Sequence, residues 1–240
     1  MSLFSEPIEA FPYKPPSEDI KAKYKKFFEI KKPIKAPFAK LVFDKIAAFL
    51  ILALCSPVLI FLIIANFIEG LIIPENRGPL FFYYNAVSAG KIFKKYKIRL
   101  IKEKCIDKDL QQKGDWHAYA KEWDPKSRTY LGKFVKKFYL DEIPQFYCVL
   151  KGDMSIVGPR PIAVHHYERD LKQGNVTRFL IKGGLLGKGH IKKGTPEMGN
   201  PIYEYEYLDT YINSSSFRLL LLDLKIIWKG FIVMLKAKGL

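Results

Sequence analysis

Two adjacent carboxylates, Asp141 and Glu142, stand where the sequence predicts the start of a helix. Asp141 is a suitable N-cap, Glu142 suits the first helical turn, and Pro144 is tolerated before the helical hydrogen bonds begin. A helix start attracts anions because its first N–H groups lack partners, so a carboxylate there stays ionised. Such a carboxylate can attack phosphorus or bind a metal ion, although an N-cap aspartate followed by glutamate is also common in purely structural helices.

Cationic residues flank this pair on both sides. They are Lys136, Lys137, Lys151 and Arg160. Arg160 lies in the proline-rich segment 158–161, and an arginine in a stiff loop can bind a phosphate through two parallel hydrogen bonds. Two adjacent phosphates repel a nucleophile, so a nucleotide diphosphate needs such cations together with a divalent ion, Mg²⁺ or Mn²⁺. The sequence has no P-loop and no G-x-S-x-G motif, so ordinary ATP chemistry and serine-hydrolase chemistry lack support.

The chain is strongly basic, with 40 Lys and Arg residues against 24 Asp and Glu and a formal net charge of +16. This excess favours an anionic partner, which is nucleic acid, anionic lipid or a phosphorylated substrate, and it does not choose among them. A hydrophobic content of 49% in 240 residues indicates a packed core rather than a disordered chain. The three cysteines lie far apart, and the four histidines show no zinc-ligand spacing to a cysteine.

An apolar stretch without a charged residue runs from Ile46 to Ile68. At about 1.5 Å per residue it is long enough to cross the hydrocarbon core of a bilayer. Ser56 and Pro57 stand at its midpoint, where proline removes a backbone donor and clashes with the preceding turn. Two half-length helices joined by a break would enter the bilayer and return, whereas a straight or kinked helix would span it. Composition leaves both arrangements open, and the preceding basic residues place the N-terminal end of the stretch in the cytoplasm.

Several other segments have recognisable patterns. Residues 79–100 predict a β-hairpin with a turn at residues 88–90, because β-prone residues flank a Ser-Ala-Gly sequence. Residues 101–130 are polar and predict a surface excursion, and the glycine-rich and lysine-rich residues 182–194 predict a mobile loop. Residues 217–235 predict an amphipathic helix. The helix either lies in a membrane interface or docks on the protein core, with its lysines reaching solvent along the edge of the docked face.

The N-terminal region differs from a secretory signal. Residues 1–20 contain glutamates and prolines where a signal needs a basic start and an apolar run, so we expect a flexible arm there. Residues 21–40 carry eight lysines and one glutamate, with aromatic and aliphatic residues between them. This segment is either a solvated basic linker or a surface that lies on anionic lipid headgroups.

Two nearly continuous segments form a motif, LDEIPQ (Leu140–Gln145) and VLKGDMSIVGPRP (Val149–Pro161). Together they resemble the signature of the bacterial sugar transferases, the monotopic polyprenol-phosphate phosphoglycosyl transferases that start glycan assembly. Weaker similarities lie at residues 78–82, 93–99, 208–209 and 223–226. Ser56 and Pro57 stand where that family breaks its membrane helix. The resemblance leaves out the first 36 residues.

The resemblance implies an α+β fold that is mostly helical. The protein would be a monotopic membrane protein with a re-entrant broken helix, a small β-hairpin and amphipathic interfacial helices. It would have a flexible basic arm over residues 1–36, a re-entrant membrane helix over residues 37–75, and a catalytic domain over residues 76–240 that ends in an amphipathic helix. The expected location is the inner membrane, with the catalytic domain facing the cytoplasm.

The resemblance also implies a ping-pong reaction. Asp141 would attack the sugar-linked phosphate of a UDP-sugar, and UMP would leave. A polyprenol phosphate, namely undecaprenyl phosphate, would then accept the phosphosugar. Asp141 and Glu142 would bind Mg²⁺ or Mn²⁺, and Glu142 would also assist proton handling. Arg160, Lys97 and Lys136 would bind the substrate phosphates. The expected partners are therefore the UDP-sugar, the polyprenol phosphate and membrane lipids, with no nucleic acid.

Some positions depart from the family pattern. Tyr139 stands where the family usually has serine or threonine, and Lys136 stands where it has an arginine. Residues 181–187 differ from the glycine-containing stretch that the family has at this place. A catalytically inactive membrane scaffold that keeps the transferase fold is therefore the alternative function. A nucleic-acid-binding protein would need its positive charge on a soluble surface, which the apolar stretch disfavours.

Overall fold

The structure, a computed structural model, describes residues 12–192 and 194–236, with the side chains of the last three outside the description. The helices are α1 (Glu18–Lys23), α2 (Lys25–Phe28), α3 (Phe38–Ile72), α4 (Lys108–Gln112), α5 (Tyr130–Lys137), α6 (Gln145–Lys151), α7 (Val164–Lys172), α8 (Thr177–Leu180), α9 (Ile202–Asn213) and α10 (Ser216–Lys236). The strands are β1 (Phe81–Ser88), β2 (Lys91–Ile98), β3 (Ser155–Val157), β4 (Ile162–Ala163) and β5 (Gly184–Leu186). Short 3₁₀ helices are η2 (Pro74–Asn76), η3 (Glu103–Cys105), η4 (Trp116–Trp123), η5 (Pro125–Ser127), η6 (Leu140–Glu142) and η7 (His190–Lys192). Within the described residues this is the expected mostly helical α+β fold, with one long apolar helix and small sheets.

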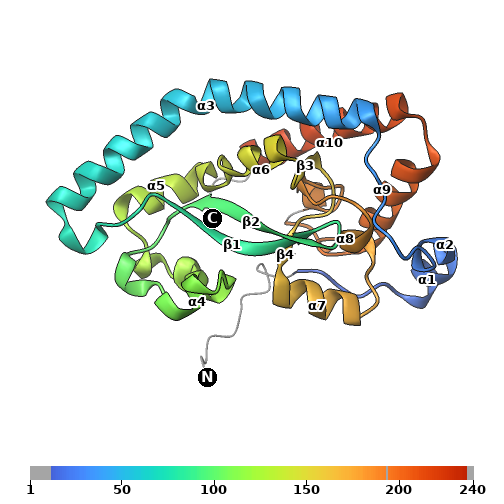
Figure 1. Cartoon of the computed structure of the whole chain (residues 1–240), viewed down its shortest axis with the longest axis horizontal. Helices are drawn as coiled ribbons and strands as arrows, with labels where there is room; N and C mark the ends of the chain where they lie inside the picture. The colour runs from blue at the N-terminus through green and yellow to red at the C-terminus, as the bar shows by residue number, and fades with distance from the viewer. Residues whose placement is uncertain (1–11, 193, 237–240) are drawn as a thin grey trace.

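The predicted β-hairpin is confirmed. Strands β1 and β2 pair antiparallel from Phe81 opposite Ile98 to Ser88 opposite Lys91. Ala89 and Gly90 form a two-residue turn in which both φ angles are positive, at 49° and 69°. Such a turn matches the right-handed twist of the two strands, which explains its place at a tight hairpin. Strand β4 extends this sheet by pairing antiparallel with β1, and Figure 1 shows the twisted hairpin at the centre of the molecule.

We expected the glycine-rich segment 182–194 to be a mobile loop, but part of it is a strand. Its first part forms strand β5, which pairs in parallel with β3. A Cβ atom on Gly184 would lie only 2.1 Å from the backbone nitrogen of Gly158, so glycine is needed where the two backbones meet. The glycines here allow close packing of a buried strand, because a side chain would separate it from the Gly158 backbone.

The polar segment 101–130 folds onto the hairpin. It forms η3, α4, η4 and η5, and it buries Trp116 and Tyr119. The ring of Tyr119 contacts that of Phe82 on β1, with 3.9 Å between their centroids. The predicted surface excursion is therefore a packed cover over one part of the hairpin.

Helix α3 is one continuous helix of 35 residues, so the prediction of two half-length helices separated by a break is wrong. Pro57 lies inside it and cannot donate to the carbonyl of Ala53, one turn earlier. The hydroxyl of Ser56 donates to that same carbonyl at 2.8 Å. Because the freed acceptor is satisfied in this way, the helix continues through the proline, and it bends near its middle (Figure 1).

Both ends of α3 are fastened to the same body. Near the N-terminal end, the carboxylate of Asp44 accepts hydrogen bonds from the Ser155 hydroxyl at 2.7 Å and from the Ile156 N–H at 3.1 Å. Near the C-terminal end, the carboxylate of Glu69 accepts from the backbone N–H groups of Tyr130 at 2.8 Å and Leu131 at 3.0 Å. The helix therefore lies along the rest of the protein instead of standing away from it.

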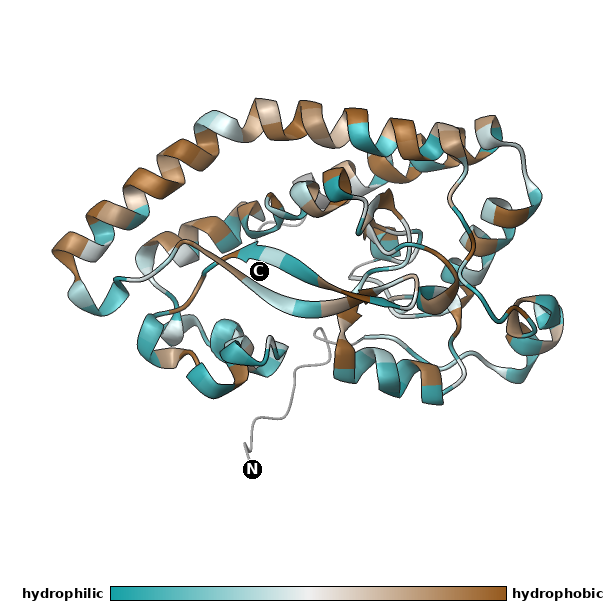
Figure 2. Ribbon diagram, in the orientation of Figure 1, coloured by the Kyte–Doolittle hydropathy of each residue, from teal (hydrophilic) through white to brown (hydrophobic). Residues whose placement is uncertain are grey.

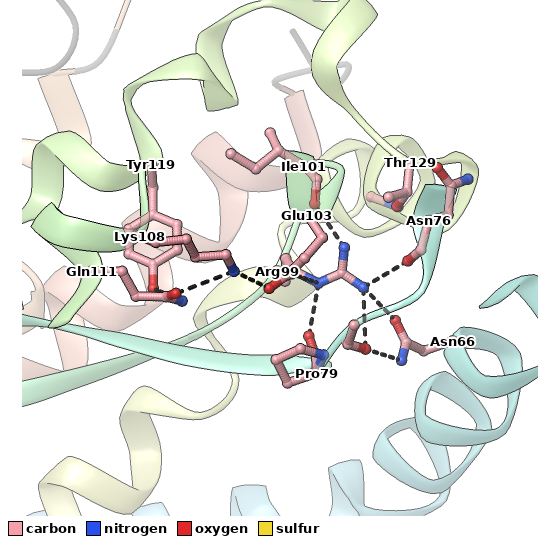
Figure 3. A network of polar contacts seen from close by, with 12 residues as sticks. Asn66, Asn76, Pro79, Arg99, Ile101, Glu103, Lys108, Gln111, Tyr119 and Thr129 are labelled. Atoms are coloured by element: carbon pink, nitrogen blue, oxygen red, sulfur yellow. Dashed lines mark hydrogen bonds and ion pairs between the residues drawn. The ribbon is translucent and has the colours of Figure 1, made fainter. Parts of the chain in front are cut away.

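Arg99, directly after β2, reinforces the second attachment (Figure 3). Its guanidinium donates to the Asn66 side chain on α3 at 3.2 Å, to the Asn76 carbonyl at 3.0 Å and to the Pro79 carbonyl at 2.7 Å. One buried arginine therefore joins the end of the hairpin to the end of α3 and to the turn between them, and each of these backbone acceptors gains a charged donor.

Helix α10 docks beside α3 and also exposes apolar residues. The buried carboxylate of Asp223 contacts Lys40 of α3 at 2.6 Å and accepts a hydrogen bond from the Tyr207 hydroxyl at 2.9 Å. Leu219 and Ile226 are buried on the same side. On the outside lie large apolar side chains, Phe217, Leu221, Leu224, Trp228 and Phe231. The helix thus combines the two arrangements that its sequence left open, a docked face and an exposed apolar face.

The N-terminal region packs against α9 within the described residues. Phe27 is buried, and the ring of Tyr24 stacks on Tyr205 of α9 with 5.6 Å between centroids. Residues 12–36 are therefore not the flexible arm that we expected, and Phe27 faces the protein core instead of lipid headgroups. Residues 1–11 of the expected arm lie outside the described residues, and the expected boundaries after residues 36 and 75 stay predictions.

The outer face of α3 is apolar and exposed. Within the described residues, α3 is the one helix that is long and apolar enough to cross a membrane, and only 11% of its most apolar window is buried. Leu54 and Phe67 are 80% and 65% exposed, and Figure 2 shows hydrophobic colour along most of the helix. An exposed apolar surface of this extent marks an interaction site, and its length indicates association with a membrane.

Candidate active site

Asp141 lies at the centre of η6, and it is 2% exposed. It is not the N-cap of the following helix, as we had expected, because α6 begins at Gln145 with Pro144 in the cap position. Tyr139, two residues before Asp141, has a positive φ of 56°. A non-glycine residue in this left-handed region costs about 1 kcal/mol or more, and such residues concentrate at functional sites. The turn at Tyr139 directs the chain from α5 into η6.

Lys97, from strand β2, reaches the Asp141 carboxylate. Its ammonium nitrogen lies 3.0 Å from Oδ2 of Asp141 and 3.5 Å from Oε2 of Glu122, and all three side chains are buried. Burial alone would lower the pKa of the Lys97 ammonium, but Glu122 and Asp141 outweigh it and raise this pKa well above its ordinary value. Lys97 therefore stays charged, and it holds the two carboxylates together.

Glu142 forms an ion pair with Arg160, which the structure brings beside η6 from the loop before β4. The two side chains are 28% and 35% exposed, so this pair lies nearer to solvent than Asp141 does. Burial acts to raise the pKa of the Glu142 carboxyl, but Arg160, Lys95 and Lys97 outweigh it and hold this pKa well below its ordinary value. Glu142 is therefore an anion, and Arg160 is a partly exposed charged group beside it.

Lys95 lies on the same face of β2 as Lys97, two residues earlier. It is 1% exposed, and its ammonium donates to the backbone carbonyl of Pro161 at 3.1 Å. Burial, together with the nearby charge of Arg160, lowers the pKa of Lys95 to about 7. The site therefore contains one lysine that is always charged and a second that titrates near neutral pH.

Lys136, at the end of α5, lies beside this group with its ammonium 5.3 Å from the centre of the Trp123 ring. Burial and the nearby charge of Lys97 lower the pKa of Lys136 below its ordinary value. The structure thus brings to one place the residues to which the resemblance gave a role, Asp141, Glu142, Arg160, Lys97 and Lys136. Ser56 and Pro57 lie apart from it, in the exposed middle of α3.

The titration of Lys95 predicts how stability depends on pH. Its folded pKa of about 7 is below its ordinary value of 10.5, so the unfolded chain holds the proton in the interval between them. The cost of burying the charged lysine is fully present below about pH 7, and it is relieved as the pH rises. We expect the stability of the wild type relative to Lys95→Met to rise by about 1 kcal/mol per pH unit between about pH 7 and about pH 9.

Thermal unfolding in detergent at these two pH values measures this difference. Lys91→Met, which replaces an exposed lysine of the same strand, is the matched control and should show no such pH dependence. A difference between wild type and Lys95→Met that is the same at both pH values would show that Lys95 stays charged in the folded protein.

Comparison with known proteins identifies the family. The sequence pattern of the family described as bacterial sugar transferase matches residues 35–237. The chain belongs to this family. The resemblance drawn from the motif between Leu140 and Pro161 is thereby confirmed.

Several curated members of this bacterial sugar transferase family are similar to the chain. The galactosyl transferase CpsE of Streptococcus agalactiae serotype III is 33% identical over 80% of this chain and 42% of the relative. A UDP-glucose:undecaprenyl-phosphate glucose-1-phosphate transferase of Klebsiella pneumoniae is 37% identical over 79% of this chain and 39% of the relative. An Aeromonas hydrophila transferase, named for UDP-N-acetylgalactosamine and undecaprenyl phosphate, is 31% identical over 86% and 46%. The chain thus spans less than half the length of these relatives, whose names differ in the sugar.

Two residues of the site were not found from the sequence. Glu122 comes from the weakly patterned segment 101–130, and its contact with Lys97 joins residues 25 positions apart. No local signal marks such a partner. Lys95 did have a signal, since residues i and i+2 of a strand lie on one face, and Lys97 was already a candidate. The period of the strand could therefore have added Lys95 to the predicted site.

Proposed function

We propose that this chain transfers a sugar-1-phosphate from a UDP-sugar to undecaprenyl phosphate and releases UMP, as the first membrane step of polysaccharide synthesis. The observation that carries the proposal is a buried carboxylate, Asp141, in contact with Lys97 beside the Glu142–Arg160 ion pair. This arrangement offers a nucleophile and several cations to a diphosphate. Membership of the bacterial sugar transferase family supports the same reaction, and so do the names of the Klebsiella pneumoniae and Aeromonas hydrophila relatives.

In the first step, a carboxylate oxygen of Asp141 attacks the phosphorus that carries the sugar. A bond forms between this oxygen and phosphorus, the bond from phosphorus to the bridging oxygen breaks, and UMP leaves with the bond electrons. Lys97 contacts Oδ2, which makes Oδ1 the attacking atom. The ammonium of Lys97 and the guanidinium of Arg160 stabilise the negative charge that develops on the phosphoryl and leaving oxygens.

In the second step, a phosphate oxygen of undecaprenyl phosphate attacks the same phosphorus. The bond to Asp141 breaks, the carboxylate is regenerated, and the phosphosugar is now linked to the lipid through a diphosphate. Lys97 stabilises the departing carboxylate as it stabilised the attacking one, because it is charged throughout. Since the same aspartate serves both steps, the donor and acceptor can use one site in turn.

The carboxylate oxygens of this site are the ligand type that Mg²⁺ prefers, which fits a divalent ion. Asp141 and Glu142 would hold it, and the partly exposed Glu142 is kept anionic. Within the described residues these two do not join a third histidine, cysteine or carboxylate in one metal-binding group. Donor phosphates would therefore supply further ligands, as is usual for Mg²⁺. When bound, the ion would neutralise charge on the diphosphate.

A metal requirement has a direct test. We expect excess chelator to remove most turnover, because a carboxylate nucleophile otherwise faces an uncompensated diphosphate. UMP release in chelator, with and without added Mg²⁺ or Mn²⁺, measures the requirement. Full turnover in chelator would show that Lys97, Lys95 and Arg160 neutralise the donor without a metal ion.

We propose that the exposed apolar middle of α3 dips into the inner membrane while both ends of this continuous helix stay on the cytoplasmic side. A helix of 35 residues is about 50 Å long, more than the hydrocarbon core of about 30 Å. If α3 were to span the bilayer, its two ends would lie on opposite sides. Asp44 near one end and Glu69 near the other are both bonded to the same body, which supports placement on one side. The exposed apolar residues of α3 and α10 would then face lipid.

This topology predicts the labelling of cysteines at the two flanks of α3. In a background without the native Cys55, Cys105 and Cys148, we expect neither Lys35→Cys nor Glu75→Cys to react with an impermeant thiol reagent in intact cells, and both to react after lysis. Both positions are exposed, so the membrane alone decides access. Labelling of the Glu75→Cys protein from outside intact cells would contradict the re-entrant placement and would put Asp141 on the wrong side for a cytoplasmic nucleotide sugar.

Assaying the protein against a panel of UDP-sugars tests the proposed function. We expect release of UMP from one or a few of them in the presence of undecaprenyl phosphate. Correctly folded protein that releases UMP from none would favour the alternative, an inactive membrane scaffold with the transferase fold. The relatives are named for glucose, galactose and N-acetylgalactosamine, so these sugars come first in the panel.

A further inference from the structure

A second group of metal-ligating side chains lies outside the candidate active site. It consists of Asp115, the N-cap of η4, His117 in the first turn of η4, and His165 on α7. His117 and His165 are 48 positions apart in the sequence. One ligand atom from each of the three lies within 4.8 Å of the others. The spacing of these residues in the sequence gives no sign of a metal site, because the two histidines meet only through the packing of η4 against α7.

The geometry of this group is favourable for a cation. Oδ1 of Asp115 lies 2.9 Å from Nδ1 of His117 and also accepts the backbone N–H of His117 at 2.9 Å, which fixes the carboxylate. The imidazoles of His117 and His165 lie against each other, with centroids 4.1 Å apart and planes tilted by 32°. Ligands about 2.0 Å from a tetrahedral ion are separated by roughly 3.3 Å, so shifts of about 1 Å would complete the site.

We propose that Asp115, His117 and His165 bind a divalent transition-metal ion of the zinc class. Two imidazole nitrogens and one carboxylate suit Zn²⁺ and its neighbours better than Mg²⁺ or Ca²⁺, which take oxygen ligands. The three side chains are neither fully buried nor fully exposed, so an ion can reach them from solvent. The fourth position is taken by water or by another side chain.

The surroundings support a site that holds its ligands in place. His166 is 3% exposed, and its ring lies 3.9 Å from that of His165 and 5.5 Å from that of Trp116. These packed rings limit how far His165 and the start of η4 can move. Ligands restrained by such neighbours bind a metal ion more tightly, because less freedom is lost on binding.

The bound ion would join two segments that both lead to the candidate active site. His117 lies five positions before Glu122, which contacts Lys97, and His165 lies five positions after Arg160. Farther along α7, Asp170 contacts Arg178 at 2.6 Å, and Arg178 donates to the Arg160 carbonyl at 2.9 Å. The ion is therefore a structural clamp between η4 and α7. The proposal does not depend on the reaction at Asp141.

Cobalt binding tests this site, with Co²⁺ as a coloured substitute for Zn²⁺. The full chain is purified in detergent without a histidine tag, stripped of metal and titrated with Co²⁺. We expect one equivalent to give the visible absorption of a tetrahedral ion. We expect His117→Gln and His165→Gln each to weaken this binding by about tenfold or more. His190→Gln, which changes a histidine outside the group, should leave the cobalt binding unchanged.

Thermal unfolding provides a second readout that uses Zn²⁺. Added Zn²⁺ should raise the Tm of the wild type and of His190→Gln, and it should not raise that of the double variant His117→Gln/His165→Gln. A wild-type protein that shows neither the cobalt absorption nor the Zn²⁺-dependent rise in Tm would overturn the proposal, whatever the variants do. Equal cobalt binding by the wild type and the double variant would also overturn it.

Discussion

Asp141→Asn is expected to lower UMP release by about 10³-fold or more, because the amide that replaces the carboxylate is a very poor nucleophile toward phosphorus. Asparagine has nearly the same shape, so the packing of η6 should be retained. The contact of Asp141 with Lys97 would weaken to a neutral hydrogen bond, and Glu122 would still pair with the lysine. Steady-state UMP release from a UDP-sugar with undecaprenyl phosphate measures the loss.

The control for this prediction is Asp109→Asn, which removes an exposed carboxylate from α4. It should keep wild-type turnover. Both variants should enter the membrane fraction in wild-type amounts and keep the wild-type helix content. A folded Asp141→Asn protein that retains turnover would remove Asp141 as the nucleophile, and Glu142 and Glu122 would be the remaining acidic candidates.

Lys97→Met is expected to have the second largest effect, on stability as well as on turnover. It leaves the buried carboxylates of Asp141 and Glu122 without the ammonium that lies 3.0 Å and 3.5 Å from them. Removing one partner of a buried ion pair costs about 3–5 kcal/mol. We expect a lower Tm and a loss of turnover, since the negative charge that develops on the phosphate would also lose one of its stabilising cations.

Two further variants separate these effects. Lys97→Met combined with Glu122→Gln should recover part of the stability, because one uncompensated carboxylate is removed, but it should not recover turnover. Lys91→Met, an exposed lysine on the same strand, should change neither quantity. An unchanged Tm and unchanged turnover for Lys97→Met would show that the ion pairs seen here contribute neither to folding nor to the reaction.

Local patterns in the sequence predicted some of the fold well. The hairpin followed from β-prone residues around a turn that has positive φ at Ala89 and Gly90. The structure also brings Asp141, Glu142, Arg160 and Lys97 together, as the motif implied. In these cases the information lies within a few residues, or in a signature that the family shares. In these cases, which residues are buried and which charges pair agree with what the residue types alone predict.

Other features depend on contacts that the sequence does not show. Pro57 predicted a break in α3, but the Ser56 hydroxyl satisfies the Ala53 carbonyl and the helix continues. Asp141 matched an N-cap, but the left-handed backbone at Tyr139 places it in a separate 3₁₀ turn. Glu122 belongs to the site only because residues 101–130 fold over the hairpin. Each of these outcomes depends on tertiary packing, which outweighs local preference.

The covalent intermediate on Asp141 is the central claim, and mass spectrometry of the intact protein tests it most directly. The protein is mixed with candidate UDP-sugars, without a lipid acceptor, and its mass is measured before and after undecaprenyl phosphate is added. The account predicts an added mass of one phosphosugar on the peptide that contains Asp141, with no more than one equivalent of UMP released, and loss of this mass when the acceptor is added. Turnover with the lipid present, together with no adduct at any time or an adduct on another residue, would contradict it.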